Sequence, residues 1–296
     1  MALNTTTNLT FNWTGYLAKT QMTTPRYIRI GAVATTLLLN FAILALYVRH
    51  RSLRTPFAVY LINLLVANLL FTALLFVDHM IKLVQPGWQS RAAVCDAYLY
   101  AWYPAAMAMT WAQVLVVQNR LWAVTFPFSY RLYHSHRVAV AVCVVKWMFV
   151  HILTLPFLIL EFRLYRRPFA ERGCDINYQA QYITAHALQV CIYDFPVIAV
   201  VALYPIIWYR MNTRKATKPK TSANGTMEQS KTETKTDGGS AFLMMTLLMV
   251  NVVVCWLPTS LVYIIMSASN LMLLPCYGEV LLVLADVFCY STICNG

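Results

Sequence analysis

Charged side chains are scarce in this chain of 296 residues, because Asp, Glu, Lys and Arg together make up only 11% of it. Acidic residues are the scarcer kind, with 11 against 23 basic residues. A soluble globular domain carries about a quarter of its residues as charged side chains. Here 59% of the residues are hydrophobic and the mean hydropathy is +0.57. This composition excludes a soluble domain and predicts a protein that crosses a membrane several times.

A concentrated basic patch and an enzyme motif are also missing. The net charge of +12 comes from basic residues scattered over short polar loops, so we predict no nucleic-acid partner. No basic segment with a cleavable apolar run comes first, so we expect no cleaved signal peptide. The histidines lack ligand or nucleophile partners at useful spacing, so we expect no enzyme, no metal and no cofactor. They are His50, His79, His134, His136, His151 and His186.

Several apolar runs are long enough to cross a bilayer as helices. The runs span approximately residues 31–48, 56–77, 93–124, 138–160, 185–208, 241–266 and 277–296. We therefore predict an all-α, seven-transmembrane helix bundle over residues 26–296. Lys, Thr, Ser and Gly dominate residues 210–239, which predicts a disordered loop on the cytoplasmic side.

The segment before the first run is polar, and it contains glycosylation sequons at Asn4, Asn8 and Asn12. Chance in a Thr-rich tail is the alternative explanation. We predict that residues 1–25 form a glycosylated extracellular tail, which agrees with a modest excess of basic residues on the inner side. A further sequon at Asn224 then lies in the cytoplasm, where we expect it to stay unmodified.

The third apolar run begins at Cys95 and ends at Asn119 and Arg120, 25 residues after the cysteine. A helix rises about 1.5 Å per residue, so the two ends lie about 37 Å apart. That length matches a bilayer core plus part of both interfaces. The run therefore places a cysteine at one membrane face and an arginine at the other.

Polar, aromatic and proline residues also occur at particular positions within or beside the remaining apolar runs. They are Asn40, Trp88, Pro127-Phe128, Trp147, Pro196, Tyr204 and Cys255-Trp256-Leu257-Pro258. Together with Cys95 and Arg120 they resemble the rhodopsin-like (class A) G-protein-coupled receptors over essentially the whole chain. Short matches resemble the muscarinic and amine branch of that family. These are Trp122-Ala123-Val124-Thr125, Phe195-Pro196-Val197 and Phe288-Cys289-Tyr290.

The resemblance implies a multi-pass receptor in the lipid bilayer of the plasma membrane. Its implied partners are an extracellular ligand and a heterotrimeric G protein. It also implies a disulfide between Cys95 and Cys174, which both fall on the outer, oxidising side. In the same outer loop the alternation of residues 162–165 predicts a short strand.

Amine receptors hold the ammonium group of their ligand with an Asp in the third helix, and the matching position here is Trp102. We expect a pocket with an aromatic lining and one acidic contact instead. The candidates are Trp102, Tyr103, Tyr193, Trp256, Tyr263 and Asp286. Bundle packing is the alternative for the aromatic residues, and a bond between helices is the alternative for Asp286. Basic residues in the outer loop favour a peptide or an apolar or anionic small molecule as ligand.

The residues expected to act in coupling and switching are Asn119, Arg120, Phe128, Tyr204 and Pro258. In the family an acid precedes the arginine, whereas Asn119 can offer only a neutral, weaker hydrogen bond. We therefore expect raised ligand-free activity if the chain couples to a G protein.

The final span ends at Gly296, where the family continues with Asn-Pro-x-x-Tyr, so the seventh helix looks truncated, either as a fragment or naturally. The alternative to a signalling receptor is a receptor-shaped, non-signalling interaction protein, a truncated or decoy receptor. A small transporter or channel is disfavoured, because inverted repeats and broken helices are missing from the sequence.

Overall fold

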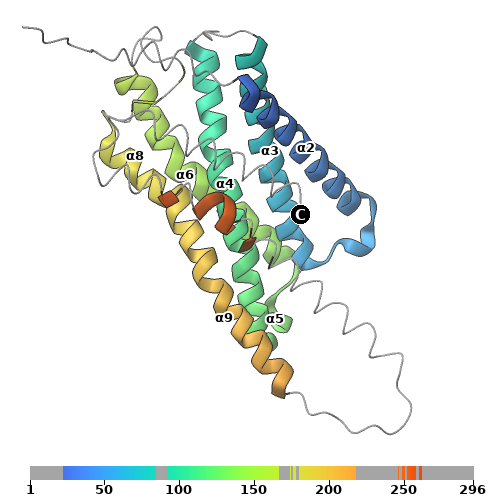
Figure 1. Ribbon diagram of the computed structural model, residues 1–296. Coiled ribbons are helices and arrows are strands. Elements are labelled where there is room, and N and C mark those ends of the chain that lie inside the picture. The colour runs from blue at the N-terminus through green and yellow to red at the C-terminus, as the bar shows by residue number, and fades with distance from the viewer. Residues whose placement is uncertain are drawn as a thin grey trace, which may run out of the picture.

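The computed structural model describes residues 23–84, 92–166, 174, 176–177, 180–217, 246, 249–250, 252–257 and 260–261. All regular secondary structure within these ranges is helical (Figure 1). The elements are α2 (Thr23–Arg49), η1 (Arg51–Leu53), α3 (Pro56–Val84), α4 (Ala92–Thr125), α5 (Pro127–Tyr133), α6 (His136–Leu160), η2 (Glu161–Tyr165), α8 (Tyr182–Gln189), η3 (Val190–Asp194), α9 (Phe195–Thr217) and η4 (Val252–Trp256). The predicted all-α fold is confirmed.

Several helices of this bundle are both long enough and apolar enough to span a membrane. Within the described residues, four helical stretches are long and apolar enough to cross a membrane: Ile30–Arg49, Pro56–Ile81, His136–Tyr165 and Tyr182–Thr213. Large apolar side chains such as Leu38, Val145 and Ile198 point outward from these stretches. Outward apolar surface on this scale suits contact with lipid tails and not with water.

Helix α4 is the centre of the bundle. It packs against α3, α6 and α9, and Figure 1 shows it between α3 and α9. Small side chains at Ala105, Ala106, Ala108 and Ala112 are buried and let neighbouring backbones approach closely. Because α4 is enclosed by other helices, it can carry polar residues such as Gln113 without exposing them to lipid.

Several predicted boundaries need correction. Helix α2 already begins at Thr23, inside the predicted tail, and α9 continues to Thr217, so residues 210–217 are helical and not loop. Tyr209 is followed by a polar stretch that suits a helix emerging from the bilayer into water. The rest of the predicted loop, the predicted seventh helix with Gly296, and the sequons at Asn4, Asn8 and Asn12 lie outside the described residues.

The short strand predicted at residues 162–165 is wrong. The structure has a π-helix there, η2, which continues α6 without a break. Its first residue, Glu161, is buried and accepts hydrogen bonds from the backbone N–H of Asn177 and from Gln181 Nε2. These bonds fix the end of α6 as helix, and an alternation over four residues is too short to outweigh them.

Candidate functional site

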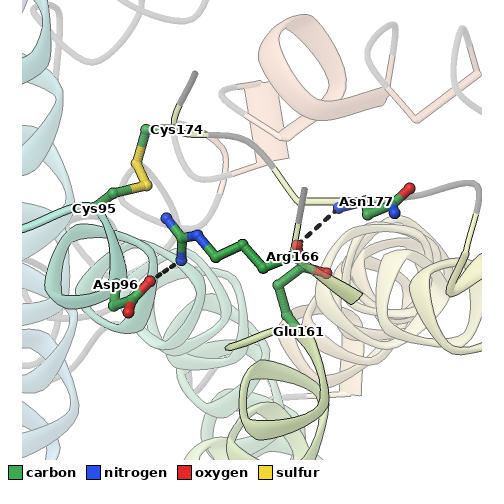
Figure 2. The surroundings of a disulfide bond; sticks show 6 residues. All are labelled: Cys95, Asp96, Glu161, Arg166, Cys174 and Asn177. Carbon is green, nitrogen blue, oxygen red and sulfur yellow. Dashed lines mark hydrogen bonds and ion pairs between the residues drawn. A yellow bond between two sulfur atoms is a disulfide. The ribbon is translucent and has the colours of Figure 1, made fainter. Parts of the chain in front are cut away.

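A covalent and ionic clamp holds the outer loop against the bundle (Figure 2). The predicted disulfide between Cys95 and Cys174 is confirmed, with Cα atoms 5.5 Å apart. Asp96, the next residue of α4, forms an ion pair with Arg166 from the far side of the same loop. The loop is therefore tied to the beginning of α4 at two neighbouring points.

Glu161 is a third anchor of this loop and is only 1% exposed. Its two carboxylate oxygens accept hydrogen bonds from Asn177 N at 3.0 Å and from Gln181 Nε2 at 2.6 Å. The Asn177 side chain in turn donates to the carbonyl of Tyr165 at 3.0 Å. A buried carboxylate needs such partners, because an unpaired one would carry a large desolvation cost.

Beneath this cap lies a small cavity of about 90 Å³. Its lining is mostly aromatic and aliphatic: Trp102, Tyr103, Phe157, Ile176, Ala185, Leu188, Gln189, Ile192 and Tyr193. Three of the predicted pocket residues, Trp102, Tyr103 and Tyr193, are among them. Ile176 comes from the clamped loop, so the loop supplies part of the cavity wall.

The other predicted pocket residues have different positions. Trp256 lies behind the lining and stacks on Tyr193, with ring centroids 5.5 Å apart. Tyr263 and Asp286 lie outside the described residues. Sequence reasoning missed Gln189, whose side-chain amide adds a polar group to the described lining. The helical spacing of Gln189 and Tyr193, four residues apart, could have indicated that they share a face.

Trp102, which stands at the amine-anchor position of the resembling branch, is part of an aromatic cluster. Its ring lies 4.9 Å from Phe71 on α3 and 5.6 Å from Tyr98 on its own helix. The indole therefore packs between α3 and α4. Among the described residues that line the cavity, none carries a carboxylate.

At the opposite end of α4, Asn119 is buried in a neutral hydrogen-bonded cluster. Its Nδ2 lies 3.0 Å from His134 Nε2, and Tyr130 Oη donates to its Oδ1 at 3.2 Å. The His134 ring stacks on Tyr130 at 4.2 Å, and Trp122 meets both rings edge-on. Burial lowers the pKa of His134, so the neutral ring can accept from the Asn119 amide.

The next residue, Arg120, contacts α3 directly. Its guanidinium carbon lies 3.5 Å from the centroid of the Phe57 ring on α3, a cation–π contact. Asn119 and Arg120 are thus adjacent in sequence but have different partners. Sequence reasoning missed Tyr130 and His134. The signal was available, since two ring-bearing residues four apart just after Pro127 suggest one helical face.

The remaining predicted switch residues do not join this cluster. Phe128 lies on α5 and is 81% exposed. Tyr204 on α9 shares a hydrogen bond of 3.0 Å with Thr246, which links the fifth predicted span to the sixth. Pro258 lies outside the described residues. Among the described residues, Phe128 and Tyr204 therefore lie in contact groups separate from the Asn119 cluster.

Buried polar residues join the spans elsewhere. Asn68 donates to Asn40 at 3.5 Å, and Trp147 donates to Asn63 at 3.0 Å. Lys146 is 4% exposed, and its Nζ donates to the Ala108 carbonyl at 3.4 Å. Over the described ranges, no group of three or more His, Cys, Asp or Glu side chains is placed to hold a metal ion.

A bundle of membrane-length helices, with a disulfide-clamped loop over a small outer cavity and an arginine at the inner end, defines a membrane receptor fold. Residues 39–295 match the seven-transmembrane receptors of the rhodopsin family, and the chain belongs to this family. The predicted membership is confirmed, as is the prediction that the chain is not an enzyme. The family consists of multi-pass membrane receptors, typically of the plasma membrane.

Individual relatives are distant and fall in the amine branch, as predicted. The 5-hydroxytryptamine receptor 1B of Mus musculus is 26% identical over 236 residues, which cover 75% of this chain and 59% of that receptor. The alpha-2B adrenergic receptor of Equus caballus is 25% identical over 164 residues, which cover 54% of this chain and 42% of that receptor. The chain spans about half the length of the curated relatives it matches.

Proposed function

We propose that this chain is a receptor that passes the binding of an extracellular ligand to a heterotrimeric G protein. The observation that carries the proposal is the layout of α4 in a chain of the rhodopsin family. Its outer half lines the cavity through Trp102 and Tyr103, and its inner end holds Arg120. One continuous helix therefore joins the outer cavity to the membrane face where a G protein would bind.

The route from the cavity to the inner face runs through two contacts. Tyr193 lines the cavity and stacks on Trp256 in η4, so a ligand that displaces Tyr193 also moves Trp256. Further along the same pair of spans, Tyr204 is bonded to Thr246. A ligand with higher affinity for one arrangement of these contacts shifts the population towards it.

For the ligand we favour a peptide or an apolar or anionic small molecule. The relatives are named as receptors for 5-hydroxytryptamine and as adrenergic receptors. In this chain the amine-anchor position is Trp102, which is packed on Phe71 and Tyr98. At this position an ammonium group would lose its hydration without gaining an anion from the described lining. The exposed Arg163 in the cap offers a positive charge to an anionic group instead.

Nucleotide exchange on purified heterotrimeric G proteins tests the coupling. Membranes that contain the full chain should give faster nucleotide exchange than matched membranes without it. At equal surface expression, Arg120→Ala should lower the exchange rate to that background. If the wild type drives no exchange on any G-protein class, the coupling proposal fails. The chain is then better described as a non-signalling interaction protein, whose Arg120 is held on Phe57.

Ligand binding is tested separately with peptides, fatty acids and amines on the full chain. We expect binding of a peptide or fatty acid that Tyr103→Ala weakens at least several-fold, and no saturable binding of 5-hydroxytryptamine. Because Ile183 is exposed and does not line the cavity, Ile183→Ala is a control that should leave binding unchanged. High-affinity binding of 5-hydroxytryptamine would exclude the proposed ligand class.

A further inference from the structure

The inner ends of α4 and α9 enclose an open groove of about 310 Å³, which is separate from the outer cavity. Leu121, Trp122, Phe126 and Ile206 give it an apolar wall. Its polar lining residues are Gln118 and Thr125 on α4 and Arg210 on α9, and Arg210 is the charged one. Figure 1 shows the lower ends of α4 and α9 close to α5. The groove therefore combines an apolar trough with a cation at one end.

Helix geometry shows that this groove opens towards lipid. Each residue turns an α-helix by about 100°, so residues two apart face nearly opposite directions. On α4, Arg120 contacts Phe57 of α3, whereas Gln118, two residues earlier, is exposed and lines the groove. On α9, Tyr204 contacts Thr246, and Ile206 points away from that contact.

The charge around the groove suits an anion. In the described part of the chain the acidic residues are Asp78, Asp96, Glu161 and Asp194, all in the outer half, and none pairs with Arg210. Exposed basic side chains at Arg131 and Arg137 lie at the same inner end. Thr125 Oγ1 makes no hydrogen bond there. The cytoplasmic leaflet of a plasma membrane carries anionic lipids, which basic groups at this level attract.

We propose that the groove binds an anionic glycerophospholipid of the cytoplasmic leaflet. One acyl chain lies along Leu121, Trp122 and Ile206, and the headgroup phosphate meets the Arg210 guanidinium. Arginine suits this role because its planar fork binds phosphate oxygens in pairs. The site depends on neither the ligand of the outer cavity nor coupling to a G protein.

The test uses the full chain in nanodiscs of phosphatidylcholine with a minor share of 1-palmitoyl-2-oleoyl-phosphatidylserine. Native mass spectrometry counts the lipids retained by the released protein. We expect the wild type to retain phosphatidylserine over phosphatidylcholine. Arg210→Gln should lower that preference about fivefold, whereas Arg210→Lys should keep most of it. Arg131→Gln, at an exposed position outside the groove, should lower the preference much less than Arg210→Gln does.

A second pair of variants tests the apolar wall. Ile206→Trp fills the groove and should reduce retention of both lipids, whereas Ile198→Trp, at an exposed site of α9 outside the groove, should not. Equal losses with Arg210→Gln and Arg131→Gln would mean diffuse attraction to the basic inner surface and would overturn the proposal. Unchanged retention with Ile206→Trp would overturn it as well. Thermal unfolding of each variant confirms that the protein is folded.

Discussion

At the scale of single residues, the pair Asn119 and Arg120 departs most from the family pattern. Where the family places an acid beside the arginine, this chain has an amide that bonds to His134 and Tyr130. Arg120 rests on Phe57 instead, through a contact of about 1–2 kcal/mol. Among the described contacts, the resting arrangement thus includes a neutral cluster at Asn119 and a cation–π contact at Arg120.

Restoring the acid should strengthen the resting state. In Asn119→Asp the carboxylate still accepts from Tyr130 and gains a charge-assisted bond to the neighbouring guanidinium, about twice as strong as a neutral bond. We expect ligand-free nucleotide exchange to fall about fivefold. Asn119→Ser, which is neutral, is the matched variant and should show no fall. An Asn119→Asp protein with undiminished ligand-free exchange would refute the argument.

His134 should make the inner cluster sensitive to pH. Burial places its folded-state pKa below the unfolded value of about 6.5, so the unfolded chain binds the proton more tightly. The stability that its neutral ring contributes is therefore fully present above about pH 6.5 and is lost as the pH falls through the folded-state pKa. The nearest titratable side chains are the stacked Tyr60 and Tyr130.

The measurement is the thermal unfolding midpoint between about pH 7.5 and about pH 5.5. We expect the midpoint of the wild type to fall with pH, and that of His134→Gln to fall less. His136→Gln, at an exposed position two residues later, should follow the wild type. Identical pH profiles for all three proteins would show that His134 is not the group responsible.

At the scale of elements, wide π-turns recur where spans bend. Within the described residues they are η2, η3 and η4. A wide turn shifts the backbone hydrogen-bond ladder and leaves carbonyls in need of other donors. In η3 the donors come from α4: Thr110 Oγ1 donates to the Ile192 carbonyl at 2.7 Å, and Trp111 Nε1 to the Cys191 carbonyl at 2.9 Å. This pairing fixes η3, and with it Tyr193, against α4.

Removing either donor should loosen this joint. Thr110→Val keeps the side-chain shape and Trp111→Phe keeps an aromatic ring against Phe195, but each leaves a buried carbonyl without its side-chain donor. We expect each to destabilise the protein by about 1 kcal/mol, measured as a lower thermal unfolding midpoint in detergent. Thr35→Val removes only a bond within α2 and should be close to neutral. A Thr110→Val protein as stable as Thr35→Val would contradict this account.

At the scale of the whole molecule, the two ends of the bundle are built differently. The outer end is held by the disulfide, the Asp96–Arg166 pair and the bonds of Glu161. The inner end relies on the neutral Asn119 cluster and the Tyr204–Thr246 bond. A firm outer end and a less constrained inner end suit a receptor whose signalling motion occurs at the inner face.

The predicted orientation is tested by glycosylation. If the first segment is extracellular, Asn4, Asn8 and Asn12 should carry glycans and Asn224 should not. Substituting each of these Asn residues by Gln in turn and following the mass shift after glycosidase treatment would show which sites are used. A glycan on Asn224 would show that the predicted topology is reversed or that the number of spans before Asn224 is different.

The ends of the helices and the choice of contacts differ in how far they could be predicted. Apolar length located α4 and α6 to within a few residues, because a helix in lipid must be apolar for about 20 residues, but it placed the end of α3 at residue 77 although the helix continues to Val84. The same rule could not place the end of α9, which continues past the apolar part to Thr217. It also failed at η2, where the helix depends on bonds from Glu161 to residues 16 and 20 positions away.

The sequence by itself determined the membrane setting and the helical class, because both follow from local composition. The family and the cysteine pair were predicted from the resemblance of motifs spread over the whole chain. Only the tertiary structure decided the partners of the polar residues. It placed Asn119 against His134, Thr110 against the carbonyl of Ile192, and Arg210 beside an apolar groove. These partners come from different helices, and their meeting depends on how the helices pack and rotate, which no single segment specifies.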